Sequence, residues 1–255
     1  MPETDPFQSA DSGYSITVAG NMNPAIHHPA WYKIIGALSD VEIAASGAVG
    51  DVKPVPEPTE PSDIVQGGLF VPSPTSGPVL TPAFTAFTAG KLRIVCVQQN
   101  WTISTYERET FTRACEVACN VFAALPQTPV SAYGFNFNFH RKVGTANVAS
   151  RLAQLADAVA FDFLLDRQGD RSATLHYSLN EGPRTLNISL EPSVRGSQIV
   201  FVGINAHHPI VATAGTLFQQ FDLEPLLRDH SSKDLPDAEA ILMKLLLIFE
   251  GNGKH

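Results

Sequence analysis

Residues 129–142 read PVSAYGFNFNFHRK, and they hold the clearest two-residue alternation in the chain. Four aromatic side chains alternate with small or polar ones: Tyr133, Phe135, Phe137 and Phe139 against Gly134, Asn136, Asn138 and His140. Successive side chains of a β-strand point to opposite faces, so this segment is predicted to be a strand with one aromatic face. Four aromatics on one face are typical of a sheet core. The alternative, a base-stacking platform, is disfavoured by the negative charge of the chain.

The residues before this strand predict two more strands and a helix. Alternating apolar residues predict a strand at 91–98, and a second strand follows at 100–104. Ser104 and Glu107 have the spacing of a capping box, so a helix is expected over 106–125, before Pro126. Its apolar residues recur at steps of three and four: Phe111, Cys115, Ala118, Phe122 and Leu125.

The residues after the aromatic strand predict a second set of strands and helices. A helix is expected over 146–160, followed by four short strands between 161 and 206 that form antiparallel hairpins. A last helix is expected to begin at Asp234, as its N-cap, with Pro236 in the first turn and Gly251 near the end.

These elements predict an α+β protein in which antiparallel sheets are packed on one side by helices. The two halves also fit a duplicated strand–strand–helix–strand unit. Eight of the nineteen prolines fall in residues 51–82, which are therefore expected to form a loop or linker. We accordingly predict an N-terminal arm (1–50), this Pro-rich segment (51–82) and an α+β domain (83–255).

Charge, apolar runs and cysteine count limit which partners and which cellular location are expected for this chain. The 255 residues carry a net charge of −8, and the 17 Lys and Arg are scattered, so neither nucleic acid nor an anionic membrane is an expected partner. The first residues lack the order of a secretory signal, and no apolar run is long enough to span a bilayer. Three cysteines without paired spacing predict neither disulfides nor a zinc site. A cytoplasmic protein is expected.

The sequence HHP occurs twice, at 27–29 and 207–209, and raises the question of a metal site. Neighbouring histidines in a strand face opposite ways, so each pair supplies one ligand, and His28 and His208 are the candidates. The other interpretation is structural. A residue before proline is pushed towards extended geometry, so each HHP would end a strand at a bend, with its imidazoles capping or exposed.

Familiar catalytic signatures are missing from the sequence. It contains no Gly-rich phosphate loop, no nucleophile elbow and no zinc-protease helix motif. We therefore expect no catalytic residue and no cofactor, and we favour a non-enzymatic protein. The alternative is a metal-dependent enzyme that uses the HHP histidines. A third possibility is nucleic-acid binding through residues 139–142 with Arg108 and Arg113.

The order of elements over residues 84–250 resembles a group of uncharacterised bacterial proteins. In that group a GLRYIN-like strand stands where this chain has PVSAYGFNFNFHRKVG, and a D…LL…LH…F ending is similar to residues 221–250 here. The resemblance covers about two thirds of the chain, and the group has no activity that would be implied for it. In architecture alone, the chain resembles SecB-type chaperones, in which a small antiparallel sheet backed by helices binds extended clients.

We therefore expect a non-enzymatic protein-binding or assembly component of a bacterial or phage multi-protein system. A protein partner or self-association is predicted, through a sheet edge, a groove, or the segment around Trp31 and Tyr32. Both aromatic side chains are candidate binding residues, because such anchors concentrate binding energy.

Overall fold

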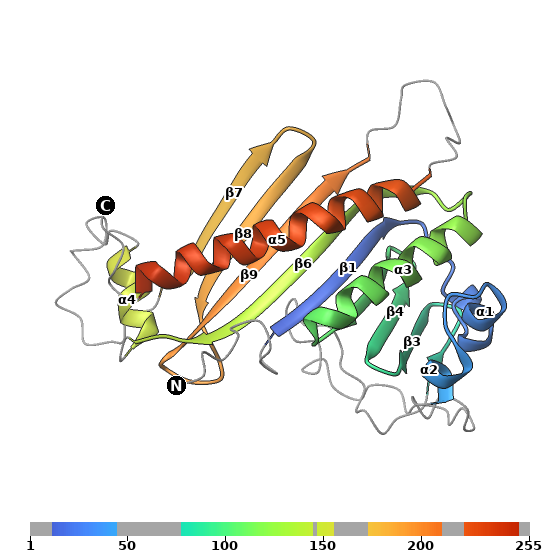
Figure 1. Cartoon of the computed structure of the whole chain (residues 1–255), viewed down its shortest axis with the longest axis horizontal. Coiled ribbons are helices and arrows are strands. Elements are labelled where there is room, and N and C mark those ends of the chain that lie inside the picture. Colours follow the sequence, from blue (N-terminus) through green and yellow to red (C-terminus); the bar gives the residue numbers. More distant parts are fainter. Residues whose placement is uncertain (1–11, 45–77, 145–146, 156–172, 211–221, 250–255) are drawn as a thin grey trace.

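In the computed structural model, the aromatic segment forms strand β6 (Val130–Lys142), near the middle of a nine-stranded sheet (Figure 1). The structure describes residues 12–44, 78–144, 147–155, 173–210 and 222–249. Every strand pair in it is antiparallel. The strand order is β2-β3-β4-β5-β1-β6-β9-β8-β7. The other strands are β1 (Ser12–Gly20), β2 (Val79–Leu80), β3 (Phe84–Ala89), β4 (Leu92–Val97), β5 (Asn100–Thr105), β7 (Leu175–Glu181), β8 (Arg184–Pro192) and β9 (Ile199–Pro209).

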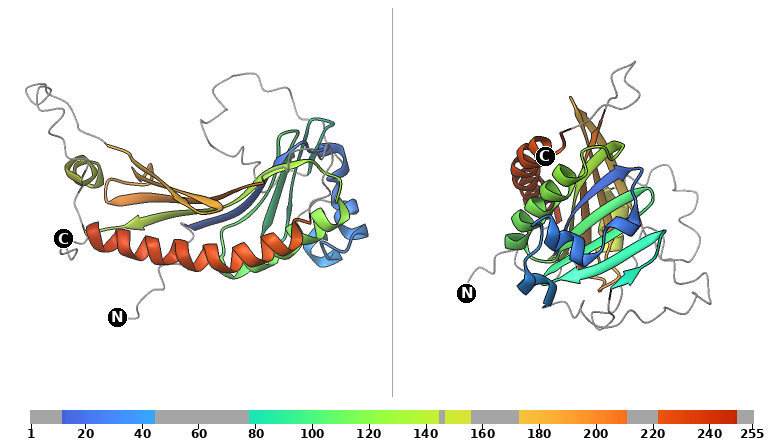
Figure 2. Two further views of the ribbon diagram at one scale, coloured as in Figure 1. Left: turned by 90° about the horizontal axis from the view of Figure 1, so that it is seen from above. Right: turned by 90° about the vertical axis from the view of Figure 1, so that its right-hand side faces the viewer.

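Two long helices, α3 (Arg108–Ala124) and α5 (Glu224–Phe249), cover the same face of the sheet (Figure 2). Shorter helices lie towards its ends: η1 (Pro24–Ile26), α1 (Pro29–Ile34), α2 (Asp40–Ala44) and α4 (Val148–Leu155). The predicted α+β class, with antiparallel strands packed on one side by helices, is confirmed. Within the described ranges, no helix is both long and apolar enough to cross a bilayer.

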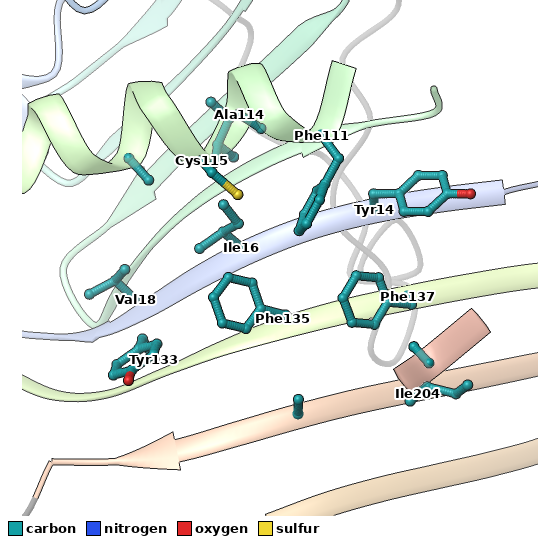
Figure 3. Packing of buried hydrophobic residues seen from close by; sticks show 14 of the residues in the cluster. Tyr14, Ile16, Val18, Phe111, Ala114, Cys115, Tyr133, Phe135, Phe137 and Ile204 are labelled. Atoms are coloured by element: carbon teal, nitrogen blue, oxygen red, sulfur yellow. The ribbon is translucent and has the colours of Figure 1, made fainter. Parts of the chain in front are cut away.

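The core lies between the sheet and the two long helices (Figure 3). The aromatic face of β6 points into it, as predicted from the alternation, and its four rings are buried. Phe111 of α3 packs edge-on against Phe137, with ring centroids 5.6 Å apart, and lies 6.0 Å from Tyr14 of β1. Cys115 and Cys119 are buried on the same helix, and burial raises the pKa of both thiols. These cysteines therefore act as small apolar side chains.

The sheet consists of two units with one element order. In each unit a single strand is followed by helical segments, by three consecutive antiparallel strands and by a long helix. The first unit is β1, β3, β4, β5 and α3, and the second is β6, β7, β8, β9 and α5. The two-residue strand β2, which pairs with β3, is an addition at the edge of the first unit. In both, the last of the three strands pairs with the single strand, and the two single strands pair with each other. The repeat is therefore strand, three strands, helix, and not the predicted strand–strand–helix–strand unit.

Strand β1 changes the predicted domain boundaries. Residues 1–50 were expected to form an arm outside the α+β domain, whereas β1 is the fifth of nine strands and lies between β5 and β6. Its Tyr14, Ile16 and Val18 are buried, because they occupy the same face as the aromatic residues of β6. Most of the Pro-rich segment lies outside the described residues, and β2 is formed by its last part.

Both long helices begin elsewhere than their capping signals predict. Ser104 remains in β5, and the N-cap of α3 is Glu107, whose backbone N–H donates to Thr105 Oγ1 at 3.2 Å. Helix α5 begins at Glu224 and runs through Pro236. Asp234 is no N-cap, because it lies inside this helix, and its carboxylate bonds to side chains of the sheet. The predicted strand at 160–166 lies outside the described residues.

The buried aromatic face predicts an asymmetric response to mutation along β6. Phe137→Ala is expected to lower the free energy of unfolding by about 3–5 kcal/mol, because it removes a large ring from a packed core. The adjacent Asn138 lies exposed on the opposite face, so Asn138→Ala is the control, with a change within about 0.5 kcal/mol. Urea unfolding followed by circular dichroism measures both, and equal costs would contradict the assignment of the two faces.

Candidate functional site

The first HHP sequence anchors the helical segment after β1. His27 is buried, and its Nδ1 lies 2.9 Å from the Tyr32 hydroxyl, which also accepts a hydrogen bond from Trp101 Nε1 at 2.7 Å. Burial lowers the pKa of His27 to about 4, so the imidazole is neutral near pH 7. His28 is exposed and is the N-cap of α1, where its Nδ1 accepts from Ala30 N at 3.0 Å. The cap formed by His28 agrees with the structural interpretation of HHP, but His27 is buried, and this HHP lies between η1 and α1 and does not end a strand.

The predicted binding pair, Trp31 and Tyr32, has unequal access to solvent. The Tyr32 side chain is fully buried between α1 and the sheet, where it packs edge-on against Phe87. Trp31 is half-buried and stacks edge-on against Tyr32. Tyr32 therefore attaches α1 to the sheet and has no surface that a partner could contact, whereas part of the Trp31 side chain is accessible.

The second HHP sequence lies at the end of β9. The first lies after β1, so the two sequences do not occupy equivalent positions of the internal repeat. His207 is half-buried, and His208 is buried on the helix-covered face. His208 Nε2 lies 2.7 Å from Asp234 Oδ2. The contacts of His28 and His208 are thus made with different elements. Among the described residues no three His, Cys, Asp or Glu side chains are grouped to hold a metal ion. A metal role for His28 and His208 stays a prediction.

His208 belongs to a cluster of rings where α5 crosses the ends of β6 and β9. The ring stacks on Tyr133, its partner across the strand pair, with centroids 4.9 Å apart and planes at 7°. On α5, His230 stacks on His208 at 4.2 Å, and its Nδ1 lies 2.6 Å from the Tyr133 hydroxyl. The three rings therefore join the helix to two strands.

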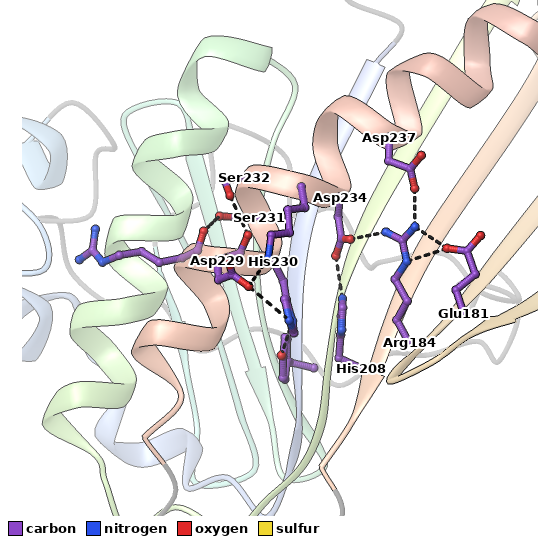
Figure 4. Close-up of polar contacts among 12 residues, drawn as sticks. Glu181, Arg184, His208, Asp229, His230, Ser231, Ser232, Asp234 and Asp237 are labelled. Carbon is purple, nitrogen blue, oxygen red and sulfur yellow. Dashed lines mark hydrogen bonds and ion pairs between the residues drawn. The ribbon is translucent and has the colours of Figure 1, made fainter.

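Asp234, one turn beyond His230, connects this ring cluster to β8 (Figure 4). Its carboxylate is 3% exposed, and each oxygen has a partner: Oδ2 bonds to His208, and Oδ1 accepts from Arg184 Nη1 at 2.5 Å. Arg184 also donates to Asp237 and Glu181. Burial opposes the charge on Arg184, but the hydrogen bonds that Arg184 donates to the three carboxylates outweigh this effect and raise its pKa. We call His208, Asp234 and Arg184 the α5 clamp.

A depression of about 390 Å³ lies over the clamp and is lined by charged groups as well as by His208 and His230. Burial and the neighbouring His208 lower the pKa of His230. Burial and the charge of Asp234 raise the pKa of Tyr133, so the phenol keeps its proton at neutral pH, with its oxygen 2.6 Å from His230 Nδ1. His208 Nδ1 is buried without a hydrogen-bond partner.

Chemically, this arrangement favours attachment of α5 over catalysis. The two serines beside His230 donate to backbone carbonyls of their own helix, Ser231 to Arg228 and Ser232 to Asp229. The only hydroxyl bonded to a histidine of the cluster, within the described part of the chain, is the phenol of Tyr133. A phenol with a raised pKa is a poor nucleophile at neutral pH. The clamp instead gives a buried carboxylate the partners that it requires.

The basic residues considered for nucleic-acid binding have partners within the protein. Arg141 is buried and donates to Ser12 Oγ at 2.8 Å. Arg108 donates to Glu239 of α5 at 3.0 Å, and Arg113 donates to Glu42 of α2 at 2.9 Å. These guanidinium groups connect helices and strands of the fold.

The sheet face opposite the long helices carries a ladder of neutral side chains across five strands. Asn136 is central: it accepts from Asn205 at 2.7 Å and donates to Ser15 of β1 at 3.3 Å. The ladder continues from Asn205 to Asn187 of β8 and from there to Ser178 of β7. A depression of about 380 Å³ lies over it, and no Asp, Glu, Lys or Arg lines this depression.

The ladder ends at β7, which is the long edge strand of the sheet. β7 pairs with β8, and six of its seven residues are exposed. Tyr177 and Leu179 are 50% and 45% exposed, although they share a face with the core residues Ile188 and Leu186 of β8. At the opposite edge, β2 has two residues.

The sequence points to two of the three α5 clamp residues for other reasons, but not to the contacts among them or to the exposure of β7. His208 was singled out for its HHP sequence and Asp234 as a helix cap, whereas Arg184, His230 and Tyr133 were not linked to them. The four-residue spacing of His230 and Asp234 is the one available signal, because it places both side chains on one face of a helix. It was hidden by the expected helix start at Asp234.

The chain matches no protein-family model and no curated protein. The resemblance to the bacterial group with the GLRYIN-like strand stays a prediction.

The buried carboxylate of the clamp predicts a large mutational effect. Asp234→Ala is expected to lower the free energy of unfolding by about 3–5 kcal/mol, because it leaves Arg184 and His208 without a buried partner. Asp229→Ala on the same helix is the matched control. Asp229 forms an exposed ion pair with Lys233, so a loss of at most about 1 kcal/mol is expected. Denaturant titration at pH 7 compares the two, and similar losses would show that the clamp does not stabilise the fold.

The neutral, buried His27 predicts a pH dependence of stability. Its pKa of about 4 lies below the unfolded value near 6.5, so between these pH values the unfolded chain binds a proton that the folded chain does not. Stability is therefore expected to fall as pH decreases from about 6.5 to 4, by up to about 3 kcal/mol from this residue.

The variant His27→Asn, which keeps a polar group near the Tyr32 hydroxyl, isolates this contribution. Its stability should change less than that of the unmodified protein over the same pH range, as measured by urea unfolding at several pH values. Parallel curves for the two proteins would refute the assignment to His27.

Proposed function

We propose that this chain is a non-enzymatic protein-binding or assembly component, and that the β7 edge is its contact surface. The observation that carries the proposal is the exposure of a full-length edge strand with two large apolar side chains, Tyr177 and Leu179. Exposed edges present unpaired backbone N–H and C=O groups, which are a template for pairing with another strand.

The sequence of β7 supports binding because it lacks the usual edge protection. Natural edge strands are blocked by Lys, by Pro, by bulges or by shortness. β7 reads LHYSLNE, with seven residues in continuous register with β8 and neither Lys nor Pro. The opposite edge, β2, is short and therefore offers little template.

Addition of a strand to this edge fits a known mode of protein recognition. Backbone hydrogen bonds supply affinity, and alternate side chains supply specificity. At β7 those side chains are Tyr177 and Leu179 on the helix-covered face and His176, Ser178 and Asn180 on the ladder face. Such a component would act within a multi-protein assembly of a bacterium or phage.

Photo-crosslinking tests the proposal in the cells that make this protein. A photoreactive amino acid at Leu179 should give a discrete protein adduct, because the incoming strand lies against that side chain. The same group at Val41, an apolar residue that is 77% exposed on α2, is the matched control and should give none. Equal adduct patterns at both positions, or no adduct at Leu179, would overturn the proposal.

A further inference from the structure

The direction of the backbone groups of β7 follows from the hairpin that joins it to β8. The turn has two residues, Gly182 and Pro183, and Gly182 has φ 64°, which glycine adopts without strain. The flanking pair Glu181 and Arg184 is then a hydrogen-bonded pair, and such pairs alternate along an antiparallel ladder. The backbone groups of residues 175, 177, 179 and 181 therefore point towards β8, and those of residues 176, 178 and 180 point away from the sheet.

These outward groups make β7 complementary to a second copy of itself. In an antiparallel pair centred on Ser178, the middle residue of β7, residue 176 of one copy faces residue 180 of the other, and Ser178 faces Ser178. Each of these is a hydrogen-bonded position, so the pair would form about six backbone hydrogen bonds.

The side chains match in the same register. Tyr177 faces Leu179 of the second copy, and Leu179 faces Tyr177, at positions without backbone bonds, where opposite side chains approach most closely. All four lie on the helix-covered face, beside the buried Leu186 and Ile188 of β8. Pairing would therefore cover the two most exposed apolar side chains of β7 with each other.

Charge does not oppose this pairing, although the whole chain carries −8. The one charged residue of β7 is Glu181, at the end of the strand, where it accepts hydrogen bonds from Arg184. In the proposed pair, Glu181 faces Leu175 of the second copy, so no like charges face each other.

We propose that a second copy of this chain pairs with the β7 edge, which joins two nine-stranded sheets into one continuous sheet around a two-fold axis at Ser178. The interface is isologous, since the same strand is used by both copies. The inference rests on the proposed function, because it names the partner of that same edge.

Two measurements on the purified protein test whether two copies pair through β7. Sedimentation velocity over a roughly hundred-fold range of concentration should show a monomer–dimer equilibrium. Hydrogen exchange should show that the amides of residues 176, 178 and 180 become protected as the dimer forms. Protection at other edges, or none with rising concentration, would overturn the pairing.

Variants at Ser178 separate the edge from the rest of the fold. Ser178→Pro removes one outward N–H and no backbone hydrogen bond to β8, and proline is accepted at such edge positions. It also removes the hydroxyl that donates to Asn187 of β8, a loss that it shares with Ser178→Ala. It should abolish the dimer and leave the circular dichroism spectrum unchanged. Ser178→Ala keeps the N–H and is the matched control, which should dimerise like the unmodified protein.

A further variant covers the case in which Ser178→Pro does not fold. The double change Tyr177→Lys and Leu179→Lys places four ammonium groups at the centre of the pair, on side chains that are exposed in the monomer. It should remain folded and monomeric. A dimer that survives this change would overturn the proposed interface.

The crosslinking experiment distinguishes failure of this inference from failure of the proposed function. An adduct at Leu179 with another protein, together with a purified chain that is monomeric at every concentration, would overturn the pairing of two copies. The same result would support the protein-binding function. An adduct with the chain itself supports both. No adduct and no dimer would overturn both.

Discussion

The antiparallel pairing of β1 with β6 is the constraint on which the rest of the structure depends. These are the single strands of the two repeated units, and they alone join the units within one sheet. Their pairing aligns Tyr14, Ile16 and Val18 with the aromatic residues of β6, so a continuous apolar face is available to α3 and α5. Burial of that face is the main driving force for the fold, because large apolar side chains gain most from leaving water.

The second unit fastens its long helix through a buried carboxylate, whereas the ion pairs of α3 are partly exposed. α3 is held by apolar packing and by ion pairs at its surface, whereas α5 carries a buried carboxylate at Asp234. A buried charge requires partners in fixed positions, and these come from the ends of β8 and β9 through Arg184 and His208. The α5 clamp therefore sets where the helix crosses the sheet, and His208 of the second HHP sequence is part of it.

The placement of α5 also explains why β7 is left open. The helix covers the strands next to β6 but leaves Tyr177 and Leu179 exposed at the edge, although these residues continue the apolar face. On the other face, the neutral side chains of the ladder from Ser178 to Ser15 form hydrogen bonds with one another across neighbouring strands. Within the described residues, the edge thus combines outward backbone groups with exposed apolar side chains, and both favour the addition of a strand.

The sequence by itself determined the local elements and the fold class. Period-two and period-four patterns predicted β4, β5, β6 and α3, and the HHP sequences indicated bends at which imidazoles cap or end elements. The alternation of Tyr14, Ile16 and Val18 was also present in the sequence, yet nothing local shows that β1 enters the sheet between β5 and β6. Only the tertiary structure decided that position, the start of α5 and the clamp, because pairing between distant strands and the partners of a buried charge depend on contacts between residues far apart in the chain.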